Sequence, residues 1–567
     1  MKKIFLSAAL ITAASQLGAT TMVSPQNAYK AVLNIFAYDA NGKLLRSGNA
    51  FYVEAPGVAV TSYTMLDGAV RAEVIDTKGK KYAIHRILGA NAATDLIKFS
   101  IANCKNSEFF TIATTAANTT TPLQMVRYSN EKKKALQTAT ILSDEAYNAY
   151  RYYHTNIGND ATNLTLPLMD QSGNLVAIVQ RNVDTKATGA CAIDARFINE
   201  LNIDATAAFN TELRQLAIPK ALPHEAKEAM AYIYMLPAND SLACFTAYND
   251  YISTFPKLAD GYAGRAALNA RYNQYQASEN DFNSALEIAS TDTTGLKADA
   301  IHYNWSTLIY QIAITRNDTT AFFKDWNLQK AEAEADQAYR LSPYPVYLMQ
   351  KGHCQLAQNN YDGAYRSYLK ACEDKTFASS ETYYAAALAL EKSGKDSAQV
   401  IALLDKCIAL LPQPIQAKSA QYYWERASLL IQAGRYREAV FDYNEYEKAI
   451  GPNNLNATFY YIRQQTEMQA RMYQQALDDI HTAIATAQDP LPFMLEECLI
   501  LLRVGEYAQT AEQAEKLLKL QPENADAHKI AGIAFGELGN KPKALQHLNK
   551  AQQFGDTSVT ALIQKYK

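Results

Sequence analysis

A sequence period of 34 residues in the second half of the chain is the feature that most limits its fold. Gly505 and Gly539 stand 34 residues apart, and Arg471 precedes Gly505 by the same interval. The copies share a turn, an aromatic residue soon after it, and small residues at fixed places. Because one antiparallel helix pair cannot bury its apolar stripe alone, this period predicts a stack of helix pairs.

The same pattern recurs, with slippage, at Gly434, Tyr436 and Ala439. These residues and their spacing resemble the tetratricopeptide repeat, which implies an all-α superhelix whose groove holds an extended segment or a partner helix. We expect about nine repeats over residues 224–567. Small residues should let helices approach closely, and tyrosines after the turns should fill the gaps between neighbours: Gly352, Ala364, Ala439, Ala476 and Gly532, and Tyr361, Tyr436, Tyr473 and Tyr507.

Two arginines on first helices of these repeats are the candidate partner-binding residues. Arg426 and Arg463 lie on the helix of each repeat that is nearest the groove in the tetratricopeptide pattern. A solvated polar face explains both residues equally well.

The first two hundred residues carry four blocks in a fixed order. A glycine-led strand, a turn and an apolar strand occupy residues 48–69, and an apolar strand follows an aspartate within residues 85–101. Residues 161–180 and 188–203 add a turn with an apolar strand, then a closing strand and helix. The order resembles the HtrA-like branch of the trypsin-like serine proteases. This resemblance implies an all-β double barrel over residues 28–205.

The resemblance places three residues where the family carries its catalytic triad. Thr64 stands in the place of the histidine, Asp95 in that of the aspartate and Leu164 in that of the serine. A serine hydroxyl attacks well only when an imidazole takes its proton, and the carboxylate only orients that imidazole. The glycines beside the nucleophile, which aim backbone N–H groups at the oxyanion, are also replaced, by Thr162, Thr165 and Leu166. The pattern predicts a pseudoprotease that is not an enzyme.

An alternative is a hydrolase with relocated or partner-completed catalytic groups. Thr64 or Thr165 would then be the nucleophile, with His85 or His154 as its base. Nothing in the sequence spacing brings such a pair together. The favoured interpretation is that Asp95 caps a turn and that both histidines are surface or satisfied core residues.

The chain begins with the pattern of a secretion signal. Lys2 and Lys3 precede an apolar run over residues 4–14 and then several small residues, so we expect a signal peptide over residues 1–19. No cysteine follows the run, which speaks against a lipid anchor, and no later stretch is apolar enough to span a bilayer. The expected location is the periplasm of a Gram-negative bacterium or the outside of the cell.

Charge and cysteine content exclude several classes of partner and site. A formal net charge of -3 over 567 residues argues against a nucleic-acid or anionic-membrane partner. The seven cysteines form no C-x-x-C pair and have no histidine at metal spacing, so we expect neither a metal nor a cofactor. Cys104 and Cys191 are the pair to test for a disulfide, and the others should be buried thiols.

The two regions join at a proline-bearing segment. Pro219–Pro223 lies in a stretch, residues 206–223, that we expect to be a linker. The combination predicts an exported, non-catalytic scaffold or adaptor that holds a protein or an extended peptide in its repeat groove. Components of an envelope or secretion complex are the expected partners.

Overall fold

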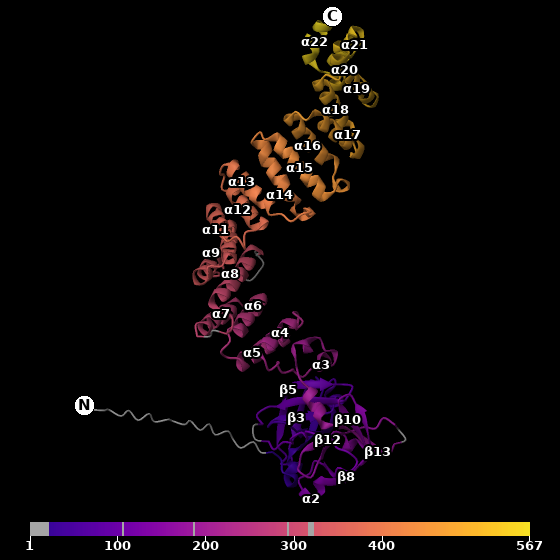
Figure 1. Ribbon diagram of the computed structural model, residues 1–567, viewed down its shortest axis with the longest axis vertical. Coiled ribbons are helices and arrows are strands. Elements are labelled where there is room, and N and C mark those ends of the chain that lie inside the picture. The colour runs from indigo at the N-terminus through magenta and orange to yellow at the C-terminus, as the bar shows by residue number, and fades with distance from the viewer. Residues whose placement is uncertain (1–21, 105–106, 185–186, 292–293, 316–322) are drawn as a thin grey trace, which may run out of the picture. The chain divides into compact units, whose positions relative to one another are not determined.

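The chain folds into two compact units, Met1–Lys297 and Ala298–Lys567 (Figure 1). The computed structural model describes residues 22–104, 107–184, 187–291, 294–315 and 323–567. The segment expected to be a signal peptide, residues 1–19, lies outside the described residues. The first unit begins with β strands and ends with helices, and the second is helical throughout its described parts.

A closed barrel of six antiparallel strands opens the first unit. The strands run around it in the order β1-β2-β3-β6-β5-β4. Strand β1 alternates buried with half-buried residues, as expected of a strand with one face on a core. The bounds are β1 (Val32–Tyr38), β2 (Leu44–Tyr52), β3 (Val58–Thr61), β4 (Arg71–Ile75), β5 (Lys81–Asn91) and β6 (Leu96–Ile101), with 3-10 helix η1 (Pro25–Ala31) before β1 and helix α1 (Tyr63–Leu66) after β3.

A second sheet of seven strands follows, in the order β8-β7-β11-β12-β13-β10-β9. Its two end strands are separated by Thr140 alone, whose carbonyl oxygen accepts from the Asn156 amide of β10 at 3.1 Å. The sheet therefore curls onto itself, and the expected all-β double barrel is confirmed. The bounds are β7 (Leu123–Val126), β8 (Leu136–Ala139), β9 (Ile141–Tyr147), β10 (Tyr150–Gly158), β11 (Pro167–Met169), β12 (Leu175–Gln180) and β13 (Gly189–Asp194), with α2 (Lys132–Ala135) and η2 (Ala161–Asn163) between strands.

The first unit continues as helices after the second barrel. Two helix pairs close it, α4 with α5 and α6 with α7. The bounds are η3 (Ala195–Glu200), η4 (Ala205–Phe209), α3 (Thr211–Gln215), α4 (Ala226–Met235), α5 (Ser241–Thr254), α6 (Asp260–Arg271) and α7 (Tyr275–Ala289).

The segment expected to be a linker is packed against the first barrel. The Ile87 amide of β5 donates to Pro219 O at 2.9 Å, and the Ala221 amide donates to Ile87 O at 2.8 Å. Next to this pairing, the Arg86 guanidinium forms two hydrogen bonds to Asp250 of α5, at 2.8 and 2.9 Å. Residues 206–223 are thus paired with β5, and α5 is bound to the same strand through Asp250.

The second unit is a series of helix pairs followed by a last helix (Figure 1). Within the described ranges of both units, nine successive pairs run from α4 to α21. The bounds are α8 (Ala298–Thr315), α9 (Leu328–Leu341), α10 (Pro345–Ala357), α11 (Tyr361–Ala371), α12 (Ser380–Lys392), α13 (Ser397–Ala409), η5 (Ala417–Ser419), α14 (Ala420–Gln432), α15 (Tyr436–Ile450), η6 (Pro452–Asn454), α16 (Ala457–Ala470), α17 (Tyr473–Thr486), α18 (Leu491–Val504), α19 (Tyr507–Leu520), α20 (Ala525–Glu537), α21 (Lys541–Gln553), η7 (Thr557–Val559) and α22 (Thr560–Tyr566).

The turns inside the pairs use left-handed backbone, which explains their glycines. Gly434, Gly505 and Gly539 have φ angles of +72°, +85° and +79°. Such angles strain any residue with a Cβ atom. Arg471 takes the same place in its repeat with a φ of +61°, so the period survives there without a glycine.

Small residues permit the close helix packing expected from the sequence. A Cβ atom on Gly352 would lie 2.4 Å from the Tyr368 ring, and one on Gly532 would lie 2.6 Å from Leu548. Ala364, Ala439 and Ala476 are fully buried. The tyrosines that follow the turns, Tyr361, Tyr436, Tyr473 and Tyr507, are only half-buried, whereas the fully buried tyrosines Tyr368 and Tyr443 lie in the middle of second helices.

All seven cysteines are free thiols, so the predicted Cys104–Cys191 disulfide is wrong. Cys104 follows β6 of the first barrel, and its Sγ contacts the Tyr52 hydroxyl at 3.1 Å. Cys191 lies in β13 of the second barrel, with its Sγ 3.6 Å from His154 Nδ1. The two thiols belong to different barrels and have different partners.

Candidate functional site

The protease-like site of the first unit is built around the carboxylate of Asp95. Its Oδ1 accepts from the backbone amide of Thr64 at 2.7 Å and from the Thr64 hydroxyl at 2.8 Å. Asp95 stands in the turn between β5 and β6 with a φ of +49°, and Thr64 lies in α1. The fold therefore brings together two of the three positions that the family resemblance aligned with the triad.

Leu164, at the third position, follows η2 in the second barrel. The side chain of Asn49 in β2 reaches across to this loop, where its Nδ2 donates to Leu164 O at 2.9 Å and to Thr162 O at 3.0 Å. The Asn49 carbonyl in turn accepts from the Thr61 hydroxyl at 2.8 Å. Asn49 thus joins the two barrels beside the loop that carries Leu164.

The backbone of the same loop is engaged in internal hydrogen bonds. The Leu164 amide donates to Ala161 O at 3.4 Å and closes a 3-10 turn, while the Thr165 amide donates to Val179 O at 2.8 Å. Thr165 holds a φ of +64°, which is uncommon for a residue with a branched Cβ. These N–H groups point into the loop and its neighbouring strand, and an oxyanion hole needs them to point outward.

The two histidines weighed as possible bases lie in other surroundings. His85 of β5 neighbours Arg86 and Asp250, and burial together with the Arg86 charge lowers its pKa. His154 of β10 contacts Cys191 and lies 3.6 Å from Glu145. Within the described residues, neither histidine forms a hydrogen bond or ion pair with Thr64, Asp95 or Thr165.

In the repeats, Arg426 and Arg463 are held inside the array, which corrects the expectation that they bind a partner. The Arg463 guanidinium, in α16, binds Asp479 of α17 at 2.6 and 2.7 Å, and Glu447 of α15 at 2.6 Å. Only 7% of Arg463 is exposed. Arg426 of α14 repeats the arrangement, with Asp442 at 2.6 and 2.9 Å and Asp405 at 2.6 Å.

The arginine contact is a recurring device, which we name the arginine tie. In each tie, an arginine on a first helix forms two bonds to an aspartate 16 residues later and one or two bonds to the second helix of the preceding pair. Arg265 forms the same tie in the first unit, with Asp281 and Asn249. The spacing of 16 is visible in the sequence, and it was the signal that could have shown these arginines to be structural.

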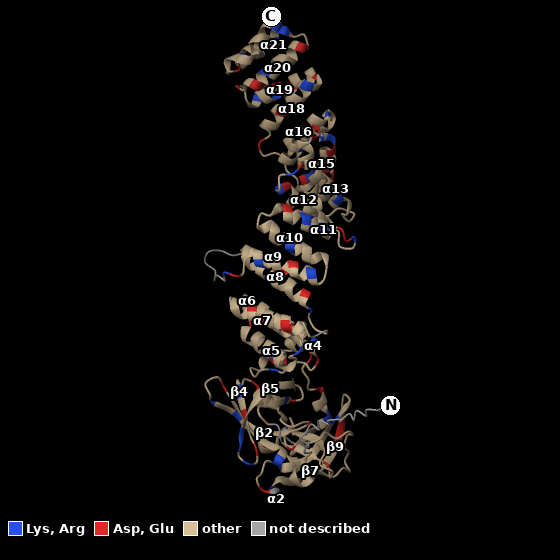
Figure 2. Ribbon diagram, turned by 90° about the vertical axis from the view of Figure 1, so that its left-hand side faces the viewer, with Lys and Arg blue, Asp and Glu red and all other residues tan. Residues whose placement is uncertain are grey.

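A groove of about 210 Å³ lies between α12, α13 and α14 of the second unit. Trp424 lies in its wall together with two carboxylates, Glu391 and Glu425. Glu425 Oε1 accepts from the Tyr384 hydroxyl at 2.6 Å, and burial, together with the charge of Glu391, raises its pKa. In the described structure, neither glutamate forms an ion pair, so two carboxylates line the groove without a cationic partner in contact. Over the helical part of the chain, acidic and basic residues are interspersed (Figure 2).

The described ranges contain neither a cluster of metal-binding side chains nor a helix that could span a membrane. No three His, Cys, Asp or Glu side chains there gather closely enough to hold a metal ion. None of the helices in these ranges combines the length and the hydropathy that a membrane span requires.

Comparison with known proteins gives one curated relative and two solved structures of interest. No family model matches the chain. The BBSome complex member BBS4 of Bos taurus is 23% identical over 241 residues, which cover 41% of this chain and 43% of that protein. The Rv3671c protease of M. tuberculosis, in its active form, aligns with 13% identity and a TM-score of 0.27 over 35% of this chain and 92% of that one. Its inactive serine-to-alanine mutant aligns with 13% identity and a TM-score of 0.26 over 31% and 88%. The chain spans less than half the length of the curated relative that it matches.

Proposed function

We propose that this chain is an exported adaptor, which binds protein segments through its helical repeats and has a protease-like unit that does not hydrolyse peptides. The observation that carries the non-catalytic part is the contact of Thr64 with Asp95. The carboxylate that would orient an imidazole instead binds a hydroxyl and a backbone amide, at 2.8 and 2.7 Å. The basic and apolar pattern of residues 2–14 supports export to the periplasm or the medium.

The chemistry of the three positions supports the same proposal. A threonine hydroxyl is a far weaker base than imidazole near neutral pH, so Thr64 offers no acceptor for a nucleophile's proton. Leu164 has no nucleophilic atom, and its amide is already bonded to Ala161 O. The base and the nucleophile are therefore replaced, and one amide that could donate to the oxyanion is bonded elsewhere. Each of these groups normally contributes to the rate of peptide hydrolysis.

The groove between α12 and α14 supports the binding part of the proposal. An indole face beside two carboxylates suits a lysine or arginine side chain, because the ring and both charges attract a cation. The similarity to BBS4, a member of a protein complex, also favours a protein-binding role. The partner is then a protein segment that presents a basic side chain to Trp424, Glu391 and Glu425.

The purified mature chain is expected to show no labelling by a serine-directed fluorophosphonate and no turnover of unfolded casein. The physical reason is the absence of an activated nucleophile at Leu164 and of a base at Thr64. The Thr64→His, Leu164→Ser double variant should remain at least about 10³-fold below an ordinary serine protease, since the loop amides stay bonded internally. Gel fluorescence and peptide release measure both outcomes.

Heat-denatured chain is the control for non-specific labelling. Casein turnover that survives repeated purification and disappears in Asp95→Ala would show a working catalytic site and overturn the proposal. Protease-level activity in the double variant would show that the loop geometry is intact.

A charge reversal in the groove is expected to weaken partner capture about tenfold or more. Glu391→Lys places a cation where the partner's basic side chain should lie, and Glu391 is exposed, so the fold should not change. Partners that the immobilised full chain captures from envelope extract are quantified by mass spectrometry. The matched control is Glu373→Lys, an exposed position after α11 that does not line the groove. Equal capture by the two variants would remove the groove from the proposal.

A further inference from the structure

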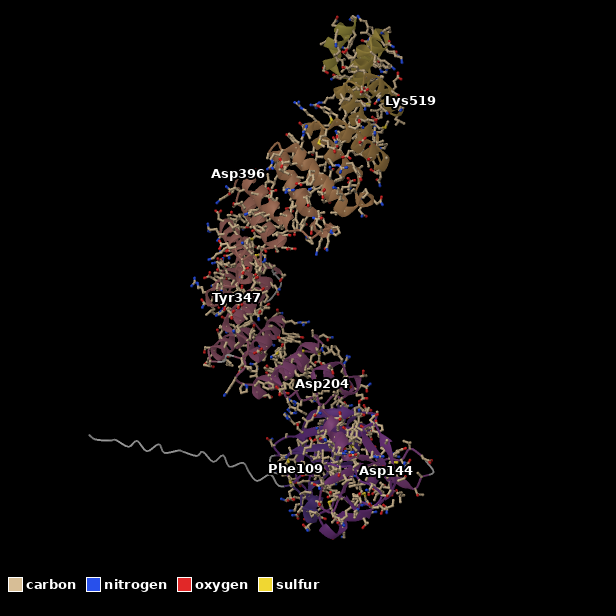
Figure 3. The ribbon with its side chains drawn as sticks, viewed as in Figure 1. Phe109, Asp144, Asp204, Tyr347, Asp396 and Lys519 are labelled. Carbon is tan, nitrogen blue, oxygen red and sulfur yellow. The ribbon has the colours of Figure 1, made fainter. Side chains whose placement is uncertain are left out.

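A cavity of about 420 Å³ lies inside the first unit, between the segment after the second barrel and the first helix pair. Its walls come from η4, α3, residues 216–222, α4 and α5. Asp204, labelled in Figure 3, caps η4 by accepting from the Thr206 amide at 2.8 Å, which fixes one wall. We name this space the α3–α5 cavity; its apolar lining includes Ala207, Leu213, Leu216, Tyr232, Leu236 and Leu242.

Two carboxylates line the α3–α5 cavity, and both already have partners. Asp240 caps α5 by accepting from the Ala243 amide at 3.0 Å. Asp250 receives both hydrogen bonds of the Arg86 guanidinium. Asp250 is therefore paired with Arg86, whereas Asp240 keeps its negative charge and acts on Lys220.

Two cations line the same cavity, and in the described residues neither forms an ion pair. The Lys220 ammonium donates to the carbonyl oxygen of Leu216, which is a neutral partner. Burial lowers the pKa of Lys220, while Asp240 acts in the opposite direction. Arg214 projects from α3, which Glu212 holds on the barrel by accepting from the Ala92 amide at 2.8 Å. Lys220 and Arg214 thus face Asp240 and Asp250 across apolar walls, and one positive charge is in excess once Arg86 is counted as the partner of Asp250.

The backbone at Lys220 offers an open edge beside these cations. Pro219 O and the Ala221 amide face β5, where they bond to Ile87. In a strand, the N–H and C=O groups of the intervening residue point to the opposite side. Within the described chain, the backbone groups of Lys220 form no backbone hydrogen bond, so an extended segment can pair with them.

We propose that the α3–α5 cavity binds the C-terminus of an extended peptide whose last side chain is apolar. The terminal carboxylate lies against Lys220 and Arg214, the last side chain enters the apolar walls, and the peptide backbone pairs with Lys220. Leu242, of which 78% is exposed, covers the entering chain. A volume of this size suits a few residues of peptide. The site lies outside the groove of the proposed function, so either one can fail while the other stands.

The test measures binding to the full mature chain by fluorescence anisotropy. The probe is a fluorescein-labelled octapeptide that ends in leucine with a free carboxylate, and its C-terminal amide is the matched ligand. The amide should bind about tenfold or more weakly, because it loses charge-assisted hydrogen bonds to two cations. Decanoate serves as a competitor that carries the same carboxylate on an apolar chain without a peptide backbone.

Two variants of the protein test the site from its own side. Lys220→Met keeps the apolar stem and removes the ammonium, so the free-acid peptide should bind about tenfold or more weakly while the amide changes little. Leu242→Glu, at an exposed position, should repel the carboxylate without disturbing the fold. Lys227→Met, on the exposed side of α4 and outside the lining, is the control and should bind as the unchanged chain does.

Four results would overturn the proposal. The first is equal affinity for the acid and the amide, and the second is unchanged binding by both Lys220→Met and Leu242→Glu. The third is decanoate binding tighter than the peptide, which would assign the cavity to a free fatty acid. An absence of peptide binding at millimolar concentration would equally reject the site, whereas loss of groove capture in Glu391→Lys would leave it untouched.

Discussion

Asp479→Ala is expected to accelerate amide hydrogen exchange in α16 and α17 by about two to three orders of magnitude. Asp479 is 6% exposed and receives two bonds from Arg463, at 2.6 and 2.7 Å. Removing it leaves a buried guanidinium short of its main partner, which costs about 3–5 kcal/mol in comparable sites. Exchange followed by mass spectrometry reports the local opening free energy of each helix, which a single melting curve of a repeat array does not.

The control is an ion pair of the same charges on the surface. Glu512 and Lys516 pair in α19 at 2.8 Å, with both side chains about half exposed or more. Exposed pairs of this kind contribute little, so Glu512→Ala should leave exchange in α19 within about threefold. If Asp479→Ala behaves like Glu512→Ala, the arginine tie is not a stabilising element of the array.

Gly89→Ala is expected to lower the thermal midpoint of the first unit by about 10 °C. A Cβ atom there would lie 2.1 Å from the Leu201 carbonyl carbon and 2.4 Å from its oxygen. These are backbone atoms, so β5 or the segment after η3 must move, and overpacking of this severity costs about 3 kcal/mol or more. The shift is measured by calorimetry of the full chain, together with thermal melting of the circular dichroism signal that comes from β structure.

Gly48→Ala is the matched control in β2 of the same barrel. Its added Cβ atom would meet only the terminal methyl of Met65, at 2.5 Å, and a flexible side chain can move away. The melting midpoint should therefore change by no more than about 3 °C. Equal shifts in the two variants would mean that the contact of β5 with Leu201 does not limit the stability of the barrel.

Much of the architecture follows from local pattern. Constraints that act inside one or two repeats can be seen directly in the sequence. They include the turn glycines, the small residues and the period of 34. The fold also brings Thr64 and Asp95 together, and the Thr64 hydroxyl donates to the Asp95 carboxylate at 2.8 Å. The repeat turns and the Thr64–Asp95 contact are both formed by short segments that lie near one another in the sequence.

The failures come from contacts between segments far apart in the chain. Arg463 was placed on the groove because a single repeat shows it on a first helix, whereas its partners lie on helices before and after it. The stretch at Pro219 looked like a linker because prolines end helices, yet its backbone pairs with Ile87, more than a hundred residues earlier. Cys104 and Cys191 were paired because an oxidising compartment was expected and both lie in the barrel part of the sequence. Neither reason gives the distance between the two thiols.

The arginine ties also determine where the second unit can come apart. Each tie bonds three successive helices, so a pair that contains one cannot detach without breaking bonds to the preceding pair as well. In the described residues of α18–α21, no arginine makes such a contact. One ion pair, of His481 in α17 with the buried Glu497 of α18, links α18 to the tied helices, and the lysine pairs of α19 and α21 lie nearer the surface. Under mechanical load, or in a slow fluctuation, the helices beyond α17 should peel away first. The tied helices α13–α17 would remain as the folded remnant.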